Sequence, residues 1–230
     1  MCTKGKDDET DRWNRLLVFI GMSVVTLLLE AGEVRTAVLN EAVRRYAAGE
    51  YPQAVAEIDE VEVLLEGTPM KSEAVLLRAQ IVSFTQILAR IQEAVRRSDP
   101  EAILRLVADA DELDKIIAPR GSSWREQSRK LRAWGYSLLA SRSEQRERYS
   151  DADRWYRKCA EEDPTRQECA GWLTAKPKLL QKLYLKAQLY QNYDPRQAVR
   201  LYQDICNMTE LTDEMNRKAQ QGLALIERMK

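Results

Sequence analysis

Four alanines, each a few residues beyond a turn, divide this chain into units of similar length. Ala54, Ala102, Ala152 and Ala198 are separated by 48, 50 and 46 residues. This spacing fits one antiparallel pair of helices per unit, repeated along the chain. A single pair cannot bury its apolar face alone, so neighbouring pairs must stack. The spacing therefore predicts about four helical hairpins.

Composition favours helices over the whole chain. Among 230 residues there are only nine Gly, seven Pro and two Phe. No segment alternates apolar and polar residues for long enough to predict a strand. Ala, Leu, Glu, Arg, Lys and Gln, which have high helix propensity, dominate instead. We therefore expect an all-α fold, with a core large enough to need no metal or disulfide.

Turn residues indicate where the hairpins reverse. Gly49 suits the left-handed conformation that ends a helix, and Pro52 suits the first turn of the next helix. Asp99 and Asp194 each precede a proline, so each is expected to cap a helix. Ser150 is expected to cap the second helix of the third unit.

Three further predictions concern the second half of the chain. A glutamate, Glu147, stands where the third turn would normally have a glycine. A short helix is expected over residues 165–173, with Pro177 starting the first helix of the fourth unit. Residues 212–229 carry one apolar stripe on an otherwise polar helix, which is typical of the terminal cap of a helical array.

The amino-terminal region differs from the rest. Residues 1–11 are polar and are expected to be disordered, whereas residues 12–32 are expected to form an apolar helix. Between Leu16 and Leu29 this helix has no polar face, so it must be buried in protein or lipid. These fourteen residues span about 21 Å, against roughly 30 Å for the hydrocarbon layer. Trp13 and Arg15 suit an interfacial position at one end.

Three interpretations of this helix stay open. They are a single-pass membrane anchor, a helix buried against the first repeat, and a cleaved signal peptide. Basic residues on both sides give almost no bias in membrane orientation. The residues assigned to the anchor or buried helix are Leu16, Leu17, Val18, Phe19, Ile20, Val24, Val25, Leu27, Leu28 and Leu29.

Charge and histidine content exclude several classes of function. Thirty-six basic residues balance 36 acidic ones, which argues against nucleic-acid binding. The chain has no histidine, so it lacks the commonest general base and zinc ligand. It also has no phosphate-binding loop and no hydrolase motif. We therefore expect no enzyme activity, no catalytic residue, no cofactor and no metal.

The charges are nevertheless uneven along the chain. Residues 57–66 contain five acidic side chains, whereas residues 120–148 contain eight basic and three acidic ones. Such runs are typical of solvated helix faces, and a patch that selects a charged partner is the alternative.

The four cysteines lack the spacing of a metal site. Cys159 and Cys206 fall late in the second helix of a hairpin, where a small apolar residue packs. A disulfide between Cys159 and Cys169 is a further interpretation if this region lies in an oxidising compartment. Both interpretations stay open.

The first unit resembles the tetratricopeptide repeat. Ala42, Gly49, Tyr51 and Ala54 keep an order in which small residues let two antiparallel helices approach. The period exceeds the family's length of about 34 residues, which longer first helices would absorb. Other matching positions are Ala140, Tyr149, Ala152, Tyr156, Cys159 and Pro164 in the third unit, Ala187, Ala198, Tyr202 and Ile205 in the fourth, and Ala102 and Leu106 in the second.

This resemblance implies a right-handed α-solenoid over residues 33–230, with about four irregular hairpins and a C-terminal capping helix. It also implies a concave surface, lined by the first helix of each hairpin, that binds a peptide, a helix or a whole protein. The partner-binding residues carried over by position are Leu39, Tyr46, Trp134, Ser141, Tyr184 and Gln188, with Val43, Ser137 and Gln191 beside them.

We therefore expect a non-catalytic scaffold or adaptor for protein–protein interactions. If residues 16–29 lie in lipid, the chain is membrane-associated through a single-pass anchor, a layout similar to that of anchored tetratricopeptide proteins of bacterial envelopes. The alternative is a soluble, cytoplasmic structural subunit of a larger assembly, whose apolar helix packs against another chain.

Overall fold

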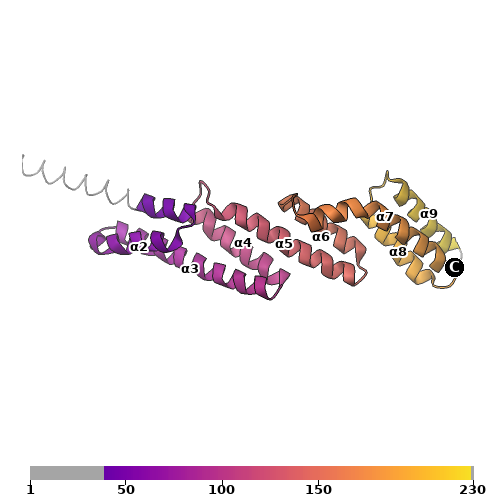
Figure 1. The fold of residues 1–230 in the computed structure, drawn as a ribbon, viewed down its shortest axis with the longest axis horizontal. Helices are drawn as coiled ribbons and strands as arrows, with labels where there is room; N and C mark the ends of the chain where they lie inside the picture. The colour runs from indigo at the N-terminus through magenta and orange to yellow at the C-terminus, as the bar shows by residue number, and fades with distance from the viewer. Residues whose placement is uncertain (1–38, 229–230) are drawn as a thin grey trace, which may run out of the picture. The chain divides into compact units, whose positions relative to one another are not determined.

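The computed structural model describes residues 39–228, and every regular element in that range is helical (Figure 1). The predicted all-α fold is confirmed. A helix over residues 39–48 comes first. It is followed by α2 (Tyr51–Glu62), the short 3-10 helix η1 (Val63–Leu65), α3 (Met70–Arg96), α4 (Pro100–Ile117), α5 (Trp124–Gln145), α6 (Tyr149–Glu162), α7 (Gln167–Tyr190), α8 (Pro195–Met208) and α9 (Glu214–Arg228).

The chain divides into two compact units. Within the described range, unit 1 comprises residues 39–86 and 113–123, and unit 2 comprises residues 87–112 and 124–228. The division passes through α3 and α4, so each of these helices contributes to both units. The expected disordered segment, residues 1–11, and the apolar helix within residues 12–32 lie outside the described residues.

Three hairpins reverse through the same backbone motif. Gly49, Ser98 and Glu147 have positive φ angles of 89°, 51° and 55°. In each case this residue donates its N–H to the carbonyl three residues back, and the next N–H bonds to the carbonyl five residues back. This is the Schellman arrangement that ends a helix. The three positions are 49 residues apart, and the turn role predicted for Glu147 is confirmed.

This period corrects the alignment of the second hairpin. The N–H groups of Ala54, Ile103, Ala152 and Ala198 each bond to the carbonyl of the residue that directly precedes the helix. Ile103 is fully buried, whereas Ala102 is half-buried. The assignment of Ala102 to this position is therefore wrong by one residue, because the turn sets the register and the small residue does not.

The helix caps follow the predictions in two cases and depart from them in one. Asp99 Oδ1 accepts the N–H of Ala102 at 3.1 Å, and Asp194 Oδ1 accepts the N–H of Gln197 at 3.1 Å. Ser150 does not cap α6; the N-cap residue is Arg148, which makes no side-chain cap bond. The prediction for Ser150 is wrong because the turn at Glu147 makes α6 begin at Tyr149, which places Ser150 inside the helix.

Pro177 lies inside α7 and does not begin a helix, so the predicted break before it is wrong. An internal proline removes a hydrogen bond and costs about 3 kcal/mol. The helix continues because both of its halves are anchored. Trp172 is buried on the amino-terminal side of the proline, and Leu180 and Leu183 are buried on the other.

Unit 1 is built on three packed aromatic rings. The ring centroids of Tyr46, Tyr51 and Phe84 lie 5.1–5.3 Å apart, in the tilted and edge-on arrangements that aromatic pairs favour. The hydroxyl of Tyr46 donates to buried Asp114 at 3.1 Å, and Ser122 donates to the same carboxylate oxygen at 2.5 Å. Burial, followed by the Asp114 charge, raises the pKa of Tyr46, which keeps this donor protonated.

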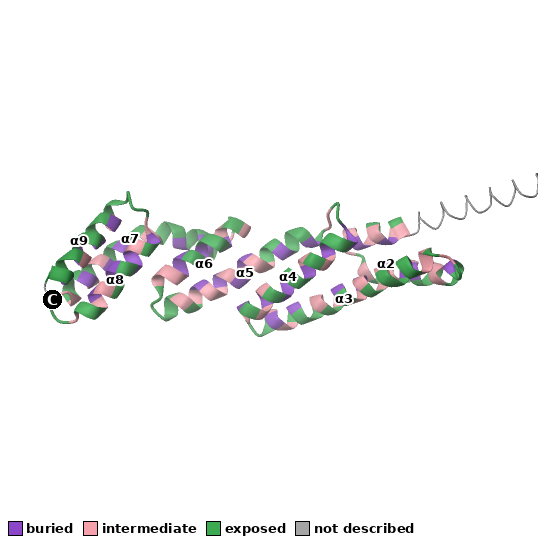
Figure 2. Ribbon diagram, turned by 180° about the vertical axis from the view of Figure 1, so that it is seen from behind, coloured by how far each residue is buried: buried purple, intermediate pink, exposed green. Residues whose placement is uncertain are grey.

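Unit 2 contains a continuous core formed by successive helices. α6 packs against α7 and α8, α7 packs against α8 and α9, and α8 packs against α9. Buried residues form stripes on the facing sides of these helices, and exposed residues cover the outer sides (Figure 2). The approach is closest at Gly222 of α9, where an added Cβ would lie 2.4 Å from the ring of Tyr202.

One described helix, α3, is long and apolar enough to cross a membrane by length and composition. Its apolar window has a mean hydropathy of 1.3. Ile81 and Phe84 of the same helix are fully buried in unit 1. Core helices of soluble proteins meet the same criteria, and α3 is not the segment predicted as an anchor.

The shared turn predicts opposite effects for two substitutions. A side chain at positive φ costs roughly 1–2 kcal/mol that glycine avoids, partly offset by the greater freedom of glycine in the unfolded chain. We expect Glu147→Gly to stabilise the protein by about 0.5–1 kcal/mol and Gly49→Ala to destabilise it by about 1 kcal/mol. Urea unfolding measures both. An equal loss of stability in the two variants would contradict the shared motif.

Candidate functional site

The partner-binding residues predicted in unit 1 do not form one surface. Tyr46 is fully buried and holds the aromatic cluster together, so its side chain offers nothing to a partner. Leu39 is half-buried at the start of the described residues. The resemblance misplaced Tyr46 because its hydroxyl has a buried acceptor, Asp114, which lies 68 residues away in the sequence.

The predicted residues of unit 2 lie on α5 and α7. Trp134 and Ser141 are half-buried on α5. Tyr184 is half-buried on α7, with its ring 5.9 Å from that of Tyr202, and its hydroxyl accepts from exposed Gln188 at 3.2 Å. The helix pairs that pack within unit 2 include α6 with α8 but not α5 with α7. The structure therefore does not bring Trp134 and Tyr184 together on one packed layer of first helices.

The structure instead shows a cleft where α6, α7 and α8 meet. Two adjoining hollows of about 430 and 530 Å³ share Arg157, Met208, Thr209 and Glu210 in their walls. We call them together the junction cleft. The first hollow is also lined by Leu173, Lys176, Pro177, Leu180, Thr212, Asp213 and Met215, and the second by Ser150, Asp151, Asp153, Arg154, Lys158, Glu161 and Asn207.

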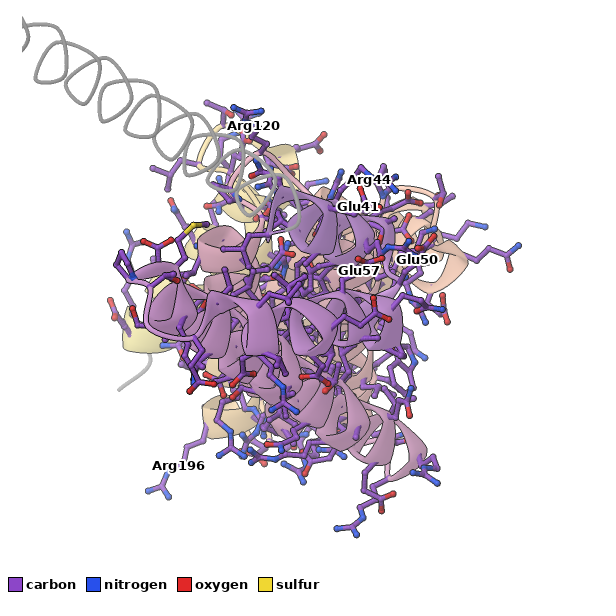
Figure 3. All side chains as sticks on the ribbon, turned by 90° about the vertical axis from the view of Figure 1, so that its left-hand side faces the viewer. Glu41, Arg44, Glu50, Glu57, Arg120 and Arg196 are labelled. Atoms are coloured by element: carbon purple, nitrogen blue, oxygen red, sulfur yellow. A yellow bond between two sulfur atoms is a disulfide. The ribbon has the colours of Figure 1, made fainter. Side chains whose placement is uncertain are left out.

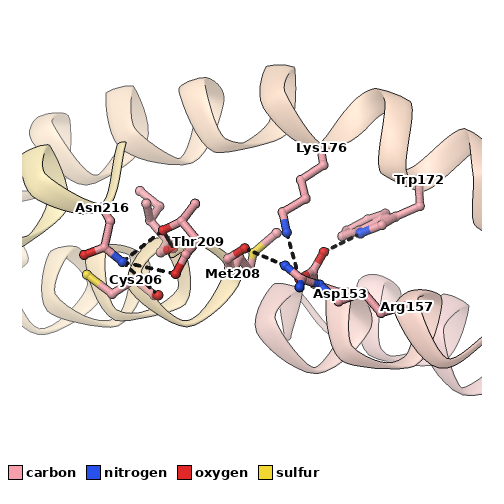
Figure 4. A network of polar contacts seen from close by, with 9 residues as sticks. Asp153, Arg157, Trp172, Lys176, Cys206, Met208, Thr209 and Asn216 are labelled. Atoms are coloured by element: carbon pink, nitrogen blue, oxygen red, sulfur yellow. Dashed lines mark hydrogen bonds and ion pairs between the residues drawn. The ribbon is translucent and has the colours of Figure 1, made fainter. Parts of the chain in front are cut away.

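A buried carboxylate fixes the walls of the junction cleft (Figure 4). Asp153 of α6 is 3% exposed. Its Oδ1 accepts from the indole N–H of Trp172 at 3.0 Å, and its Oδ2 accepts from Lys176 and Arg157, each at 2.9 Å. Arg157 also donates to the carbonyl of Met208 at 3.2 Å. One carboxylate thus connects α6 to α7 directly and to the end of α8 through Arg157.

A disulfide reinforces the same junction. Cys159 of α6 and Cys169 of α7 are joined, with their Cα atoms 6.0 Å apart, and both are fully buried. Beside them, the rings of Tyr156 and Trp172 stack with centroids 4.7 Å apart. Of the two interpretations of Cys159, the structure supports both, since it is a core residue and a disulfide partner. Cys206 is a free, half-buried thiol.

A second group of polar contacts lies at the end of α8 (Figure 4). The side-chain amide of Asn216 on α9 donates to the carbonyls of Cys206 and Thr209 and to the hydroxyl of Thr209, at 3.1–3.2 Å. These carbonyls belong to the end of α8, where helical acceptors have no intrahelical donor. Asn216 therefore fixes the loop that leads from α8 into α9.

A third buried polar residue lies between α6 and α8. Asp204 of α8 is 8% exposed and accepts the hydroxyl of Ser150 at 2.9 Å through Oδ1. Its Oδ2 has no hydrogen-bond partner. Burial raises the pKa of Asp204, and the Ser150 hydrogen bond opposes this shift.

The chemistry of the junction cleft suits binding. Leu173, Leu180 and Met215 provide an apolar wall, and Thr209 and Thr212 provide hydroxyl groups beside it. Basic and acidic side chains, among them Arg154, Lys158 and Glu161, also line it. The buried carboxylate of Asp153 is already held by three donors, from Trp172, Lys176 and Arg157. Within residues 39–228, no three Cys, Asp or Glu side chains converge in a way that could hold a metal ion.

Sequence reasoning missed the residues that build this cleft. A signal was present, because Asp153 and Arg157 stand four residues apart on one helix face, as do Trp172 and Lys176. Nothing in the sequence indicated that these two faces meet. The expected break at Pro177 also concealed that Trp172 and Lys176 belong to the same helix as the core residues that follow.

Comparisons with known proteins add no assignment to this geometry. No protein family, no curated protein and no solved structure matches the chain.

The Asp153 contacts predict a large loss of stability on substitution. Asp153→Ala leaves Lys176, whose side chain is 14% exposed, without its counter-ion and leaves the Trp172 N–H unpaired. Removing one partner of such a buried pair costs about 3 kcal/mol. Lys130→Ala, which breaks the exposed pair with Glu126, should change stability by less than about 0.5 kcal/mol. Urea unfolding compares the two, and a loss below about 1 kcal/mol for Asp153→Ala would refute this role.

Proposed function

We propose that this chain is a non-catalytic scaffold or adaptor for protein–protein interactions, and that a peptide segment of its partner lies in the junction cleft. The cleft itself carries the proposal. An apolar wall formed by Leu173, Leu180 and Met215 lies beside hydroxyl and charged groups, a combination that suits a peptide with an apolar side chain and an exposed backbone.

Rigidity of the walls supports this proposal. The disulfide, the Asp153 contacts and the stacked rings of Tyr156 and Trp172 hold α6 and α7 in one arrangement. Binding to a preformed cleft avoids part of the ordering cost that a flexible surface would incur. A partner segment would therefore find the cleft already shaped.

We further propose that the repeats are tetratricopeptide-like and stack as a right-handed α-solenoid. The support is the 49-residue recurrence of the turn and the packing of each helix of unit 2, from α6 onward, against the next one. α9 packs on α7 and α8 with a polar outer side, as a terminal cap does.

A location outside the reducing cytosol is part of this proposal. Disulfides persist mainly in oxidising compartments, and Cys159 and Cys169 form one. A single-pass anchor within residues 12–32 would then place the repeats on the outer side of a membrane, a layout similar to that of anchored repeat proteins of bacterial envelopes.

Two similarly exposed leucines test the cleft. Leu173, 43% exposed, lines it, whereas Leu225, 49% exposed, lies on α9 and is not part of its lining. In affinity capture of the full chain from membranes, Leu173→Arg should reduce the amount of recovered partner by about tenfold, and Leu225→Arg should leave it unchanged.

A double variant, W134A/Y184A, tests the surface implied by the family resemblance. Recovery of the partner should survive this change. Loss of the partner in W134A/Y184A together with full recovery in Leu173→Arg would place the interaction on the first helices instead.

Membrane fractionation tests the anchor. The full chain should sediment with membranes and resist alkaline extraction, because an apolar spanning helix is not released by charge disruption. A truncated chain that begins at Glu33 should be recovered in the soluble fraction. Recovery of the full chain in the soluble fraction would reject the anchor.

A further inference from the structure

The outer side of α7 carries exposed apolar and basic residues. Leu185 and Leu189, one helical turn apart, are 54% and 69% exposed, and Tyr193 just beyond the helix is 69% exposed. We call this surface, together with exposed Lys178 and Lys182, the α7 face. Residues on the same side of a helix at this spacing are neighbours, so the leucines and lysines form one strip.

This strip has no negative charge of its own. Residues 169–193 contain four lysines and no acidic residue. Lys178 and Lys182 are exposed and make no ion pair with another described residue. Arg196, which follows Tyr193 closely in the chain, projects away from the ribbon (Figure 3). The α7 face therefore presents a positive field beside its apolar side chains.

Unit 1 has a surface with exposed apolar and acidic side chains where α2 leads into α3. Four aliphatic side chains are exposed there: Val63 by 74%, Leu64 by 69%, Leu76 by 59% and Val75 by 44%. We call this region, with Glu60 and Glu73, the acidic end. Residues 50–76 contain seven acidic residues and one basic residue.

Most of the other acidic residues of unit 1 form ion pairs with basic residues of the same unit. The single base of that segment, Lys71, is bonded to Glu66 at 2.8 Å, and Arg45 lies 2.9 Å from Glu57. Glu60 and Glu73 make no ion pair with another described residue. They are therefore available to a partner.

The net charge also differs in sign between the two units. The described part of unit 1 has nine acidic and six basic residues, a net charge of −3, and that of unit 2 has 21 acidic and 24 basic residues, a net charge of +3. The zero net charge of the whole chain thus hides two oppositely charged parts. Because the chain has no histidine, this difference persists across the neutral pH range.

We propose that the acidic end of one copy of this chain binds the α7 face of a second copy. Both surfaces expose aliphatic side chains to water, which isolated monomers seldom do over an extended patch. Burial of these side chains supplies the attraction, and the opposite charges select the pairing and disfavour contact between like surfaces. The contact is heterologous, since two different surfaces meet.

Charge reversal tests the pairing in the full chain, kept in a neutral, non-denaturing detergent. E60K/E73K alters the acidic end, and K178E/K182E alters the α7 face. In sedimentation velocity the unaltered chain should associate with rising concentration, less strongly in high salt, and each variant should lose about tenfold or more in association constant. A matched reversal at exposed positions elsewhere, R105E/R129E, should behave as the unaltered chain, and circular dichroism should show equal helix content throughout.

A mixture of the two variants gives the sharpest outcome. Each variant alone has two surfaces of like sign, whereas in the mixture each surface finds one of opposite sign, so association should return. A chain that remains monomeric at all concentrations, or that associates equally in both variants, would overturn the proposal. So would loss of binding to vesicles of anionic lipid in K178E/K182E while the unaltered protein stays monomeric, since the α7 face would then bind lipid.

Discussion

Each of the first three hairpins depends on one backbone position that must adopt a positive φ. That position fixes which carbonyl of the ending helix accepts which N–H, and so fixes the residue at which the next helix begins. The side chains then follow the register. In the third hairpin Tyr156 donates its hydroxyl to Glu144, and in the fourth, whose turn has no residue at positive φ, Tyr202 donates to Gln191, both at 3.2 Å. The same contact between the two helices of a hairpin is thus made with different acceptors.

Buried polar contacts fix how neighbouring helices pack against each other. Burial of apolar groups alone would allow several packing arrangements. An apolar surface is not directional, but Asp153 accepts only where Trp172, Lys176 and Arg157 point at it. Asp114 acts in the same manner in unit 1, with Tyr46 and Ser122. Breaking such contacts is costly because a buried group is left unpaired, so each one restricts the helices to a single arrangement.

Much of the local structure could be predicted from the sequence, and little of the site. The all-α fold, the caps by Asp99 and Asp194 and the turn at Glu147 depend on residues close in the chain, which propensity and spacing describe well. Ala102 was misaligned because small residues are common in helices, so one of them can lie a position away from the true register.

The errors at the site have a different cause. The sequence predicts a helix start at Pro177 because the cost of an internal proline is local, whereas the packing that offsets it is not. Tyr46 was placed on a surface because its acceptor lies 68 residues further along the chain. The junction cleft depends on three helices meeting, and each of them carries only part of the pattern.

The disulfide also determines how this chain would respond to mechanical tension. Cys159 and Cys169 are ten residues apart in the sequence, so the bond shields only the short segment between them from stretching, about 30 Å of extended length. Pulling on the two ends could therefore extend almost the whole chain while α6 and the start of α7 stay joined.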